Sequence, residues 1–316
     1  MKIRSNSGFT LVELLVAIAL GLVILAGLFQ TFRTQHDTYI VQDQVAAMQQ
    51  NLRAAMYLIT RDLQMVGWYS NFDRNNRTID LDDLDERTGR LLILSEDNSD
   101  GAGGNINAGT DAMVIVKAGS ENRELIGGEW ASGASIILSN RNLGGSTGTD
   151  LNNDSKKYGL LVKSDLRAAD FFVVDTPSGP ITNEGNLLNE NYLEGDLVFR
   201  ADIIIYKVSN DASSGRPMLY RRNLGNDNGY QIVAENIENM QVRYWLSNGN
   251  WVDALTNNQG QVRAVEVILV GRTAQRQRGY TDTNTYDFAN NPNPTPNDNF
   301  RRKVLSKIVK TRNVGL

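Results

Sequence analysis

Hydrophobic and polar positions divide the chain into two unequal parts. Residues 14–29 form an apolar run without a charged side chain, and the wider stretch from Phe9 to Phe32 is interrupted only by three neutral polar residues and Glu13. At about 1.5 Å of rise per residue, a helix over this wider stretch is long enough to span the hydrocarbon core of a bilayer. The pattern therefore predicts one transmembrane helix at residues 9–32.

A helical pattern continues beyond the apolar run. Apolar residues recur at spacings of three, four and seven and form a stripe on one helix face: Val45, Met48, Leu52, Ala55, Ile59 and Val66. Arg53, Thr60, Arg61 and Gln64 fall largely off this stripe. Because no proline precedes Pro177 and Gly67 is a suitable stop, we expect one helix from Phe9 to about Val66. Its second half, residues 33–67, is expected to pack on a globular head.

From about Leu91 onward the pattern becomes that of strands. Short β-branched and aromatic runs are separated by Gly, Asn, Asp and Ser. These runs read "LLILS", "DAMVIVK", "ASIILS", "FFVVD", "DLVFRADIIIYKV", "PMLYRR", "MQVRYWL" and "VRAVEVILVGR", and a final strand is expected after the loop "ANNPNPTPNDN". The prediction is an α+β protein, with one long N-terminal helix followed by a mainly antiparallel β-sheet head at residues 68–316.

Composition removes several function classes. The chain has 316 residues, a net charge of −4, no cysteine and a single histidine, His36. Disulfides, zinc–thiolate sites, thiol catalysis and multi-histidine metal sites are therefore excluded, and an acidic chain is a poor candidate for nucleic-acid binding. No catalytic constellation and no cofactor site is predicted. Trp130, Trp245 and Trp251 are candidates for a binding surface, with burial in the core or on a sheet face as the alternative.

One weak calcium candidate is present. Asp150, Asn152 and Asp154 have the spacing that begins a calcium-binding loop. Ser155 stands where such a loop has glycine, and Leu161 stands where it has a bidentate glutamate. A solvated turn is the alternative interpretation of this segment.

The residues around the start of the apolar run predict how the chain is oriented in a membrane. Lys2 and Arg4 precede the run and no basic residue follows until Arg33, so the leader should remain cytoplasmic and the body should lie outside. No A-x-A pattern follows the run, which favours a signal anchor over a cleaved secretory signal. "SGFTLVELLVAIALG" resembles the class III signal of type IV prepilins and pseudopilins.

The resemblance implies specific roles for three residues. A prepilin peptidase would cut between Gly8 and Phe9, removing the leader at residues 1–8, and would then N-methylate the new amine of Phe9. Glu13 would be the fifth residue of the mature chain. A lone carboxylate in an apolar layer is costly, and pairing with the Phe9 amine of a neighbouring subunit would offset that cost. An interfacial glutamate that reaches the lipid headgroups is the alternative.

A second resemblance concerns the segment "NLRAAMYLITRDLQMVGWY". It is similar to PilW-like minor pilins at Arg53, Ala55, Asp62, Leu63 and Gly67, and residues 196–313 resemble the same family more loosely. We expect Arg53 and Asp62 to pack against the head and to have no chemical role.

The resemblances imply a structural protein and not an enzyme: a minor type IV pilin that takes part in pilus assembly or initiation, near the fibre tip. Its expected partners are other major and minor pilins, the prepilin peptidase and N-methyltransferase, the inner-membrane assembly platform and, before assembly, membrane lipid. It would begin as a single-pass inner-membrane protein with a periplasmic head and end in the pilus at the cell surface. The alternatives are a J-like minor pseudopilin of type II secretion and a membrane-anchored periplasmic binding protein or enzyme.

Overall fold

The structure is a computed structural model that describes most of the head and nearly all of the long helix. The described residues are 10–66, 77–81, 84–89, 93–96, 106–124, 157–165, 169–174, 192–193, 195–223, 229–255, 261–291 and 295–311. The chain divides into two compact units, Met1–Ala47 and Met48–Leu316, and each is described by itself.

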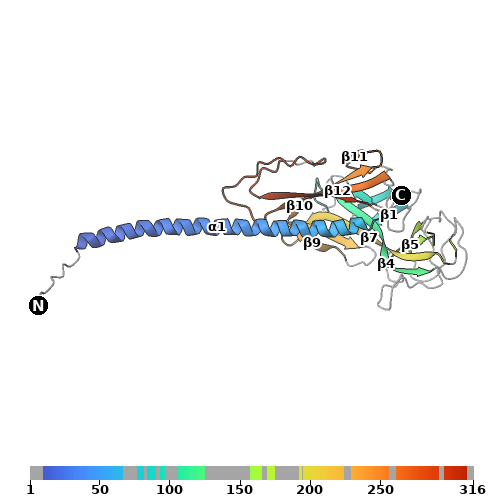
Figure 1. Cartoon of the computed structure of the whole chain (residues 1–316), viewed down its shortest axis with the longest axis horizontal. Helices are drawn as coiled ribbons and strands as arrows, with labels where there is room; N and C mark the ends of the chain where they lie inside the picture. The colour runs from blue at the N-terminus through green and yellow to red at the C-terminus, as the bar shows by residue number, and fades with distance from the viewer. Residues whose placement is uncertain are drawn as a thin grey trace. The chain divides into compact units, whose positions relative to one another are not determined.

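One α-helix, α1 (Leu11–Gln64), is present in the described part of the chain (Figure 1). Its 54 residues confirm the predicted helix to within two residues at each end. The last turn tightens, because the Met65 and Val66 N–H groups donate to carbonyls three residues earlier. Gly67, the predicted stop, lies outside the described residues. By length and composition α1 can cross a membrane.

Two antiparallel sheets form most of the described head. The larger has seven strands: β3 (Ile93–Glu96), β4 (Ala112–Glu124), β7 (Leu197–Asn210), β5 (Lys157–Val162) and β6 (Ala169–Val174) in spatial order, with β8 (Pro217–Asn223) pairing β7 and β9 (Gln231–Glu235) pairing β8. The smaller has the order β11 (Trp251–Val252), β10 (Ile237–Leu246), β12 (Val262–Arg272) and β13 (Arg302–Lys310). The α+β prediction is confirmed, with two main sheets where the sequence left one or two open.

Some strands were not predicted. β1 (Arg77–Leu81) and β2 (Leu84–Gly89) form a hairpin before Leu91, where the strand pattern was expected to begin. β5 and β9 also lie in segments that were not assigned to strands. The sequence of β2 is LDERTG, which has no apolar alternation, so backbone pairing defines this strand where side-chain pattern does not. The predicted strand at residues 134–139 lies outside the described residues.

The second half of α1 packs on the head through the predicted stripe. Five of its six residues are buried, Met48, Leu52, Ala55, Ile59 and Val66, whereas Val45 is partly exposed; Leu63, which was not assigned to the stripe, is also buried. The helix comes close to the sheet at Gly271 of β12, where an added Cβ would lie 2.9 Å from Leu52 Cγ. A glycine is needed here because the helix side chain occupies the space that any larger residue of the strand would take.

Replacing Gly271 with alanine is expected to lower the free energy of unfolding by about 1–3 kcal/mol, because the new methyl group overlaps Leu52. Urea unfolding of the full chain in detergent micelles measures this change. The double variant Gly271→Ala/Leu52→Ala should lose less stability than the sum of the losses in the two single variants, because the smaller side chain makes room for the methyl group. Strictly additive costs would contradict the contact.

Candidate functional site

The predicted processing site falls outside the described residues. Gly8 and Phe9 both precede residue 10, where the description begins. The calcium candidate at Asp150, Asn152 and Asp154 and the side chain of Trp130 also lie outside the described residues. Of the other candidate site residues from the sequence, the structure describes Glu13, Trp245 and Trp251.

Glu13 belongs to a capping box at the start of α1. Its Oε2 accepts two hydrogen bonds from Thr10, one from the backbone N–H at 3.0 Å and one from the hydroxyl at 3.0 Å. In return, the Glu13 N–H donates to Thr10 Oγ1 at 3.3 Å. This reciprocal pattern satisfies backbone donors that the first helical turn leaves without partners. The carboxylate thus has an intramolecular partner in the single chain.

Sequence reasoning missed this role of Thr10, although the signal was present. The spacing of threonine and glutamate in "TLVE" is that of a capping box just before an apolar helix. The box lies in the mature part of the predicted chain, since the expected cut is before Phe9. It can therefore hold Glu13 both before and after the predicted processing.

Replacing Thr10 with valine is expected to weaken the first turn of α1 by about 1 kcal/mol, which is the usual cost of losing an N-cap oxygen. Amide hydrogen exchange of Glu13 and Leu14, whose N–H groups donate to the Thr10 hydroxyl and the Thr10 carbonyl, should become about fivefold faster in detergent micelles, a factor that corresponds to that energy. Thr10→Ser is the matched control, because it keeps the hydroxyl. Equal exchange in the valine and serine variants would show that the cap contributes nothing.

The apolar surface that follows Glu13 is bare in this single chain. Large apolar side chains from Leu11 to Phe32 are more than half exposed, among them Leu11, Val23, Ile24, Phe29 and Phe32. An added Cβ at Gly21 or Gly27 would meet nothing within 4 Å. A surface of this size and composition on one helix requires a bilayer or neighbouring helices to cover it.

Three threonines follow the apolar run on α1. The hydroxyls of Thr31, Thr34 and Thr38 each donate to the backbone carbonyl four residues earlier, at 2.8–3.0 Å. The acceptor of Thr31 is the carbonyl of Gly27, and α1 continues through both Gly21 and Gly27 without interruption. His36 lies exposed on the same segment.

Asp62 holds the end of α1 to the larger sheet. Its side chain is fully buried, and Oδ1 lies 3.0 Å from Lys117 Nζ of β4 while Oδ2 lies 3.0 Å from Arg221 Nε of β8. The Tyr206 hydroxyl of β7 donates to Oδ2 at 2.7 Å. Burial alone would raise the pKa of Asp62, but the Tyr206 hydrogen bond and the charges of Lys117 and Arg221 outweigh it and lower that pKa.

The expectation that Asp62 packs against the head is confirmed, and the parallel one for Arg53 is wrong. Arg53 is exposed, with one long hydrogen bond of 3.5 Å to Gln49 Oε1 on the same helix. The physical reason is helix geometry: nine residues at 3.6 per turn place the two side chains on opposite faces. Thr60, which was expected to lie off the packing face, is instead buried.

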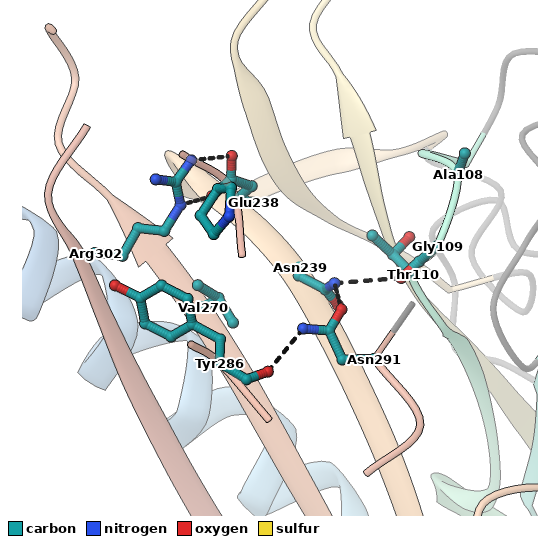
Figure 2. Close-up of a pocket in the computed structure, with 10 residues that line it drawn as sticks. Ala108, Gly109, Thr110, Glu238, Asn239, Val270, Tyr286, Asn291 and Arg302 are labelled. Atoms are coloured by element: carbon teal, nitrogen blue, oxygen red, sulfur yellow. Dashed lines mark hydrogen bonds and ion pairs between the residues drawn. The ribbon is translucent and has the colours of Figure 1, made fainter. Parts of the chain in front are cut away.

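A small polar cavity lies at the smaller sheet, where the loop after β12 meets residues 108–110 (Figure 2). Its volume is about 110 Å³. Arg302 is almost fully buried beside it and binds three carboxylates: Glu238 at 2.5 and 2.9 Å, Asp298 at 2.6 and 2.7 Å, and Asp282 at 3.3 Å. Opposite lie Asn239 and Asn291, which are hydrogen-bonded to each other at 3.2 Å.

The groups around this cavity stabilise the fold. The hydrogen bonds from Arg302 lower the pKa of Asp298, so that carboxylate stays ionised and paired. Burial would raise the pKa of Asp282, but hydrogen bonds from Tyr286, Asn284 and Arg302 lower it. Within the described residues, no group of three His, Cys, Asp or Glu side chains is arranged to hold a metal ion. The cluster joins the loop at residues 273–301 to β10.

The structure brings Trp245 and Trp251 together on one face of the smaller sheet. They pair directly across β10 and β11, and their ring centroids lie 5.2 Å apart. The Arg243 guanidinium lies 5.4 Å from the Trp251 ring centre, and Arg243 Nε lies 3.2 Å from Asp253 Oδ1. Both tryptophans are half-buried. The sheet-face alternative is therefore the one that the structure supports.

Comparison with known proteins finds two family matches. Residues 3–29 match the family described as Prokaryotic N-terminal methylation motif, and residues 205–313 match the family described as Type IV Pilus-assembly protein W. The resemblances to type IV prepilins and to PilW-like minor pilins are confirmed over these two segments. The segment that contains Arg53 and Asp62 lies outside both.

Among solved structures, the chain is similar to a type IV-like pilin, TTHA1219 from Thermus thermophilus. The two are 15% identical, the alignment covers 51% of this chain and 86% of that one, and the TM-score is 0.25. A likeness at this level adds nothing about function. No curated protein sequence matches the chain.

Proposed function

Because the chain carries a type IV prepilin N terminus and a PilW-type C-terminal segment, we propose that it is a minor type IV pilin that takes part in pilus assembly or initiation. The observation that carries the proposal is the continuity of α1. The same helix presents bare apolar residues from Leu11 to Phe32 and buries its last part, Met48–Leu63, in a β-rich head. One helix thus provides an apolar surface that a membrane or a fibre can cover and a second surface that packs on the head.

The proposed function gives the parts of the chain their roles. Residues 1–8 are a leader that the prepilin peptidase removes before Phe9, residues 9–32 are the transmembrane and polymerisation helix, and residues 33–67 support the head at 68–316. Before assembly, the helix lies in the inner membrane and the head lies in the periplasm. The assembly platform then incorporates the whole chain into the fibre with other major and minor pilins.

We also propose a position near the fibre tip. A head of more than 200 residues with two main sheets is bulky for a subunit that must repeat along a shaft, whereas a tip places no such limit on its size. The role is structural and not enzymatic. The match to Type IV Pilus-assembly protein W supports a pilus over the type II secretion alternative.

The experiment compares N-terminal peptides from sheared surface fibres and from membranes by mass spectrometry. The proposal expects a mature chain that begins at N-methylated Phe9 in the fibres. An uncut chain that begins at Met1 and is found only in membranes would overturn it. Immunogold labelling of the head on intact fibres then tests the position, since labels spaced along the shaft would contradict a tip location.

A further inference from the structure

β13 forms one edge of the smaller sheet. It pairs with β12 over nine residues, from Arg302 opposite Arg272 to Lys310 opposite Ala264, without a register shift. Within the part of the chain that the structure describes, no strand pairs with its second edge. At about 3.4 Å per residue, the open edge is roughly 30 Å long.

The register shows which backbone groups point to this open edge. At the two ends of the ladder, the Thr273 N–H donates to the Arg301 carbonyl at 2.9 Å and the Thr311 N–H donates to the Arg263 carbonyl at 3.1 Å. Alternate residues of an antiparallel strand bond to the same neighbour, so the odd-numbered residues of β13 face β12. The outward N–H and C=O groups therefore belong to Val304, Ser306, Ile308 and Lys310.

The side chains along the edge differ between the two faces of the sheet. Ile308 is 55% exposed and lies on the face of Glu266, its partner across the ladder. Lys303 and Lys307 are exposed and lie on the other face, because they alternate with Ile308 along the strand. Lys310 is also exposed at the end of the strand. Within the described residues, the edge thus combines backbone groups without a strand partner, one bare apolar side chain and a concentration of positive charge.

We propose that the open edge of β13 receives an extended, carboxylate-bearing segment of a different pilus subunit, which adds a strand to the smaller sheet. The added strand presents acidic side chains beside Lys303 and Lys307 and an apolar side chain beside Ile308. Main-chain hydrogen bonds supply the affinity in this mode of recognition, and alternate side chains supply the specificity. This inference rests on the proposed function, since the partner is a neighbour in the fibre.

Charge complementarity selects the partner. Lysines on an edge strand oppose pairing with a second copy, because like charges then lie opposite each other. The same lysines attract a strand of opposite charge, and the outward backbone groups of the edge can hydrogen-bond to such a strand. The charges on β13 therefore oppose pairing with β13 of a second copy and favour pairing with an acidic strand of another subunit.

Residue-resolved hydrogen exchange on the full chain tests the added strand directly. Exchange is compared between the membrane fraction and sheared fibres that contain the N-methylated mature chain. The amides of Val304, Ser306, Ile308 and Lys310 should exchange at least about tenfold more slowly in fibres, whereas those of Lys303, Leu305, Lys307 and Val309, already bonded to β12, should not change. Unchanged rates at the even positions would overturn the proposal.

Photocrosslinking identifies the neighbour. Ile308 is replaced by a benzoylphenylalanine residue, fibres are irradiated, and the joined peptide is sequenced by mass spectrometry. The proposal expects a peptide from a different subunit that carries aspartate or glutamate. A peptide from a second copy of this chain, or no crosslink in fibres that contain the chain, would overturn it.

Two variants and a matched control complete the test. Lys303→Glu/Lys307→Glu should reduce the crosslink at least about tenfold by reversing the edge charge, and Arg216→Glu/Arg278→Glu, which changes two exposed arginines on loops, should not. Ile308→Pro, tested by exchange, removes one outward N–H without taking a bond from β12.

The inference and the proposed function can fail separately. If Phe9 is N-methylated and the chain is in fibres while β13 is unprotected, this inference fails and the proposed function stands. If the chain never enters fibres, the proposed function fails.

Discussion

Replacing Asp62 with alanine is expected to lower the free energy of unfolding by about 3–5 kcal/mol. The carboxylate is fully buried between Lys117 and Arg221, whose side chains are only 16% and 21% exposed. Its removal leaves two cations close together with little water to solvate them, and leaves the Tyr206 hydroxyl without its acceptor. Urea unfolding of the full chain in detergent micelles measures the loss.

Two controls separate this effect from a general change in helix charge. Asp43→Ala removes an exposed carboxylate of the same helix and should change the free energy of unfolding by no more than about 0.5 kcal/mol. Asp62→Asn keeps the shape and an acceptor for Tyr206 but not the charge, so its cost should lie between the two. A loss below about 1 kcal/mol for Asp62→Ala would contradict an ion-pair anchor.

The pH dependence of stability has a definite sign. The pKa of Asp62 is lowered in the folded chain relative to about 3.9 in the unfolded chain. Its stabilisation is therefore fully present above the unfolded pKa and is lost as the pH falls through the folded pKa. Asp62→Asn should remove this part of the acid sensitivity, so the difference in stability between the original chain and the variant should shrink as the pH is lowered below about 4.

The elements that follow strong periodicity could be predicted from the sequence. The helix from residue 11 to residue 64 and the strand at Val262–Arg272 both show long, regular apolar patterns, and the structure has them where they were expected. β2 and β9 could not be predicted, because β2 is polar, β9 has only five residues, and the pairing of both strands depends on neighbours supplied by the fold. The order of strands in the two sheets depends on contacts distant in sequence, which no local pattern specifies.

In the candidate sites too, contacts between residues close in sequence could be predicted and contacts between distant residues could not. The capping box of Thr10 and Glu13 is local and was available from a spacing of three residues. The partners of Asp62 were not, because Lys117, Tyr206 and Arg221 lie 55, 144 and 159 residues away along the chain. The orientation of Arg53 was nevertheless within reach of sequence reasoning, since its separation of nine residues from Asp62 already places it on the opposite helix face.

Replacing Glu13 with glutamine is expected to reduce incorporation of the chain into fibres by about a hundredfold. An unpaired charge in the apolar layer costs about 2.5–3.5 kcal/mol, and if Glu13 pairs with the Phe9 amine of a neighbouring subunit, that contact recovers the cost on assembly. Glutamine removes both the cost in the membrane and the gain in the fibre, and so removes the drive toward assembly. The ratio of the chain in sheared fibres to that in membranes, from quantitative immunoblots, measures the effect.

Glutamine is the informative substitution because of the capping box. In the single chain Glu13 accepts hydrogen bonds from the Thr10 N–H and hydroxyl, and a glutamine at this position of a capping box performs the same task. Glu13→Gln therefore removes the charge and keeps the cap, whereas Thr10→Val removes the cap oxygen and keeps the charge. If charge pairing drives assembly, Glu13→Gln should fail and Thr10→Val should enter fibres at near-normal levels. The reverse result would assign Glu13 a role within its own helix and contradict pairing between subunits.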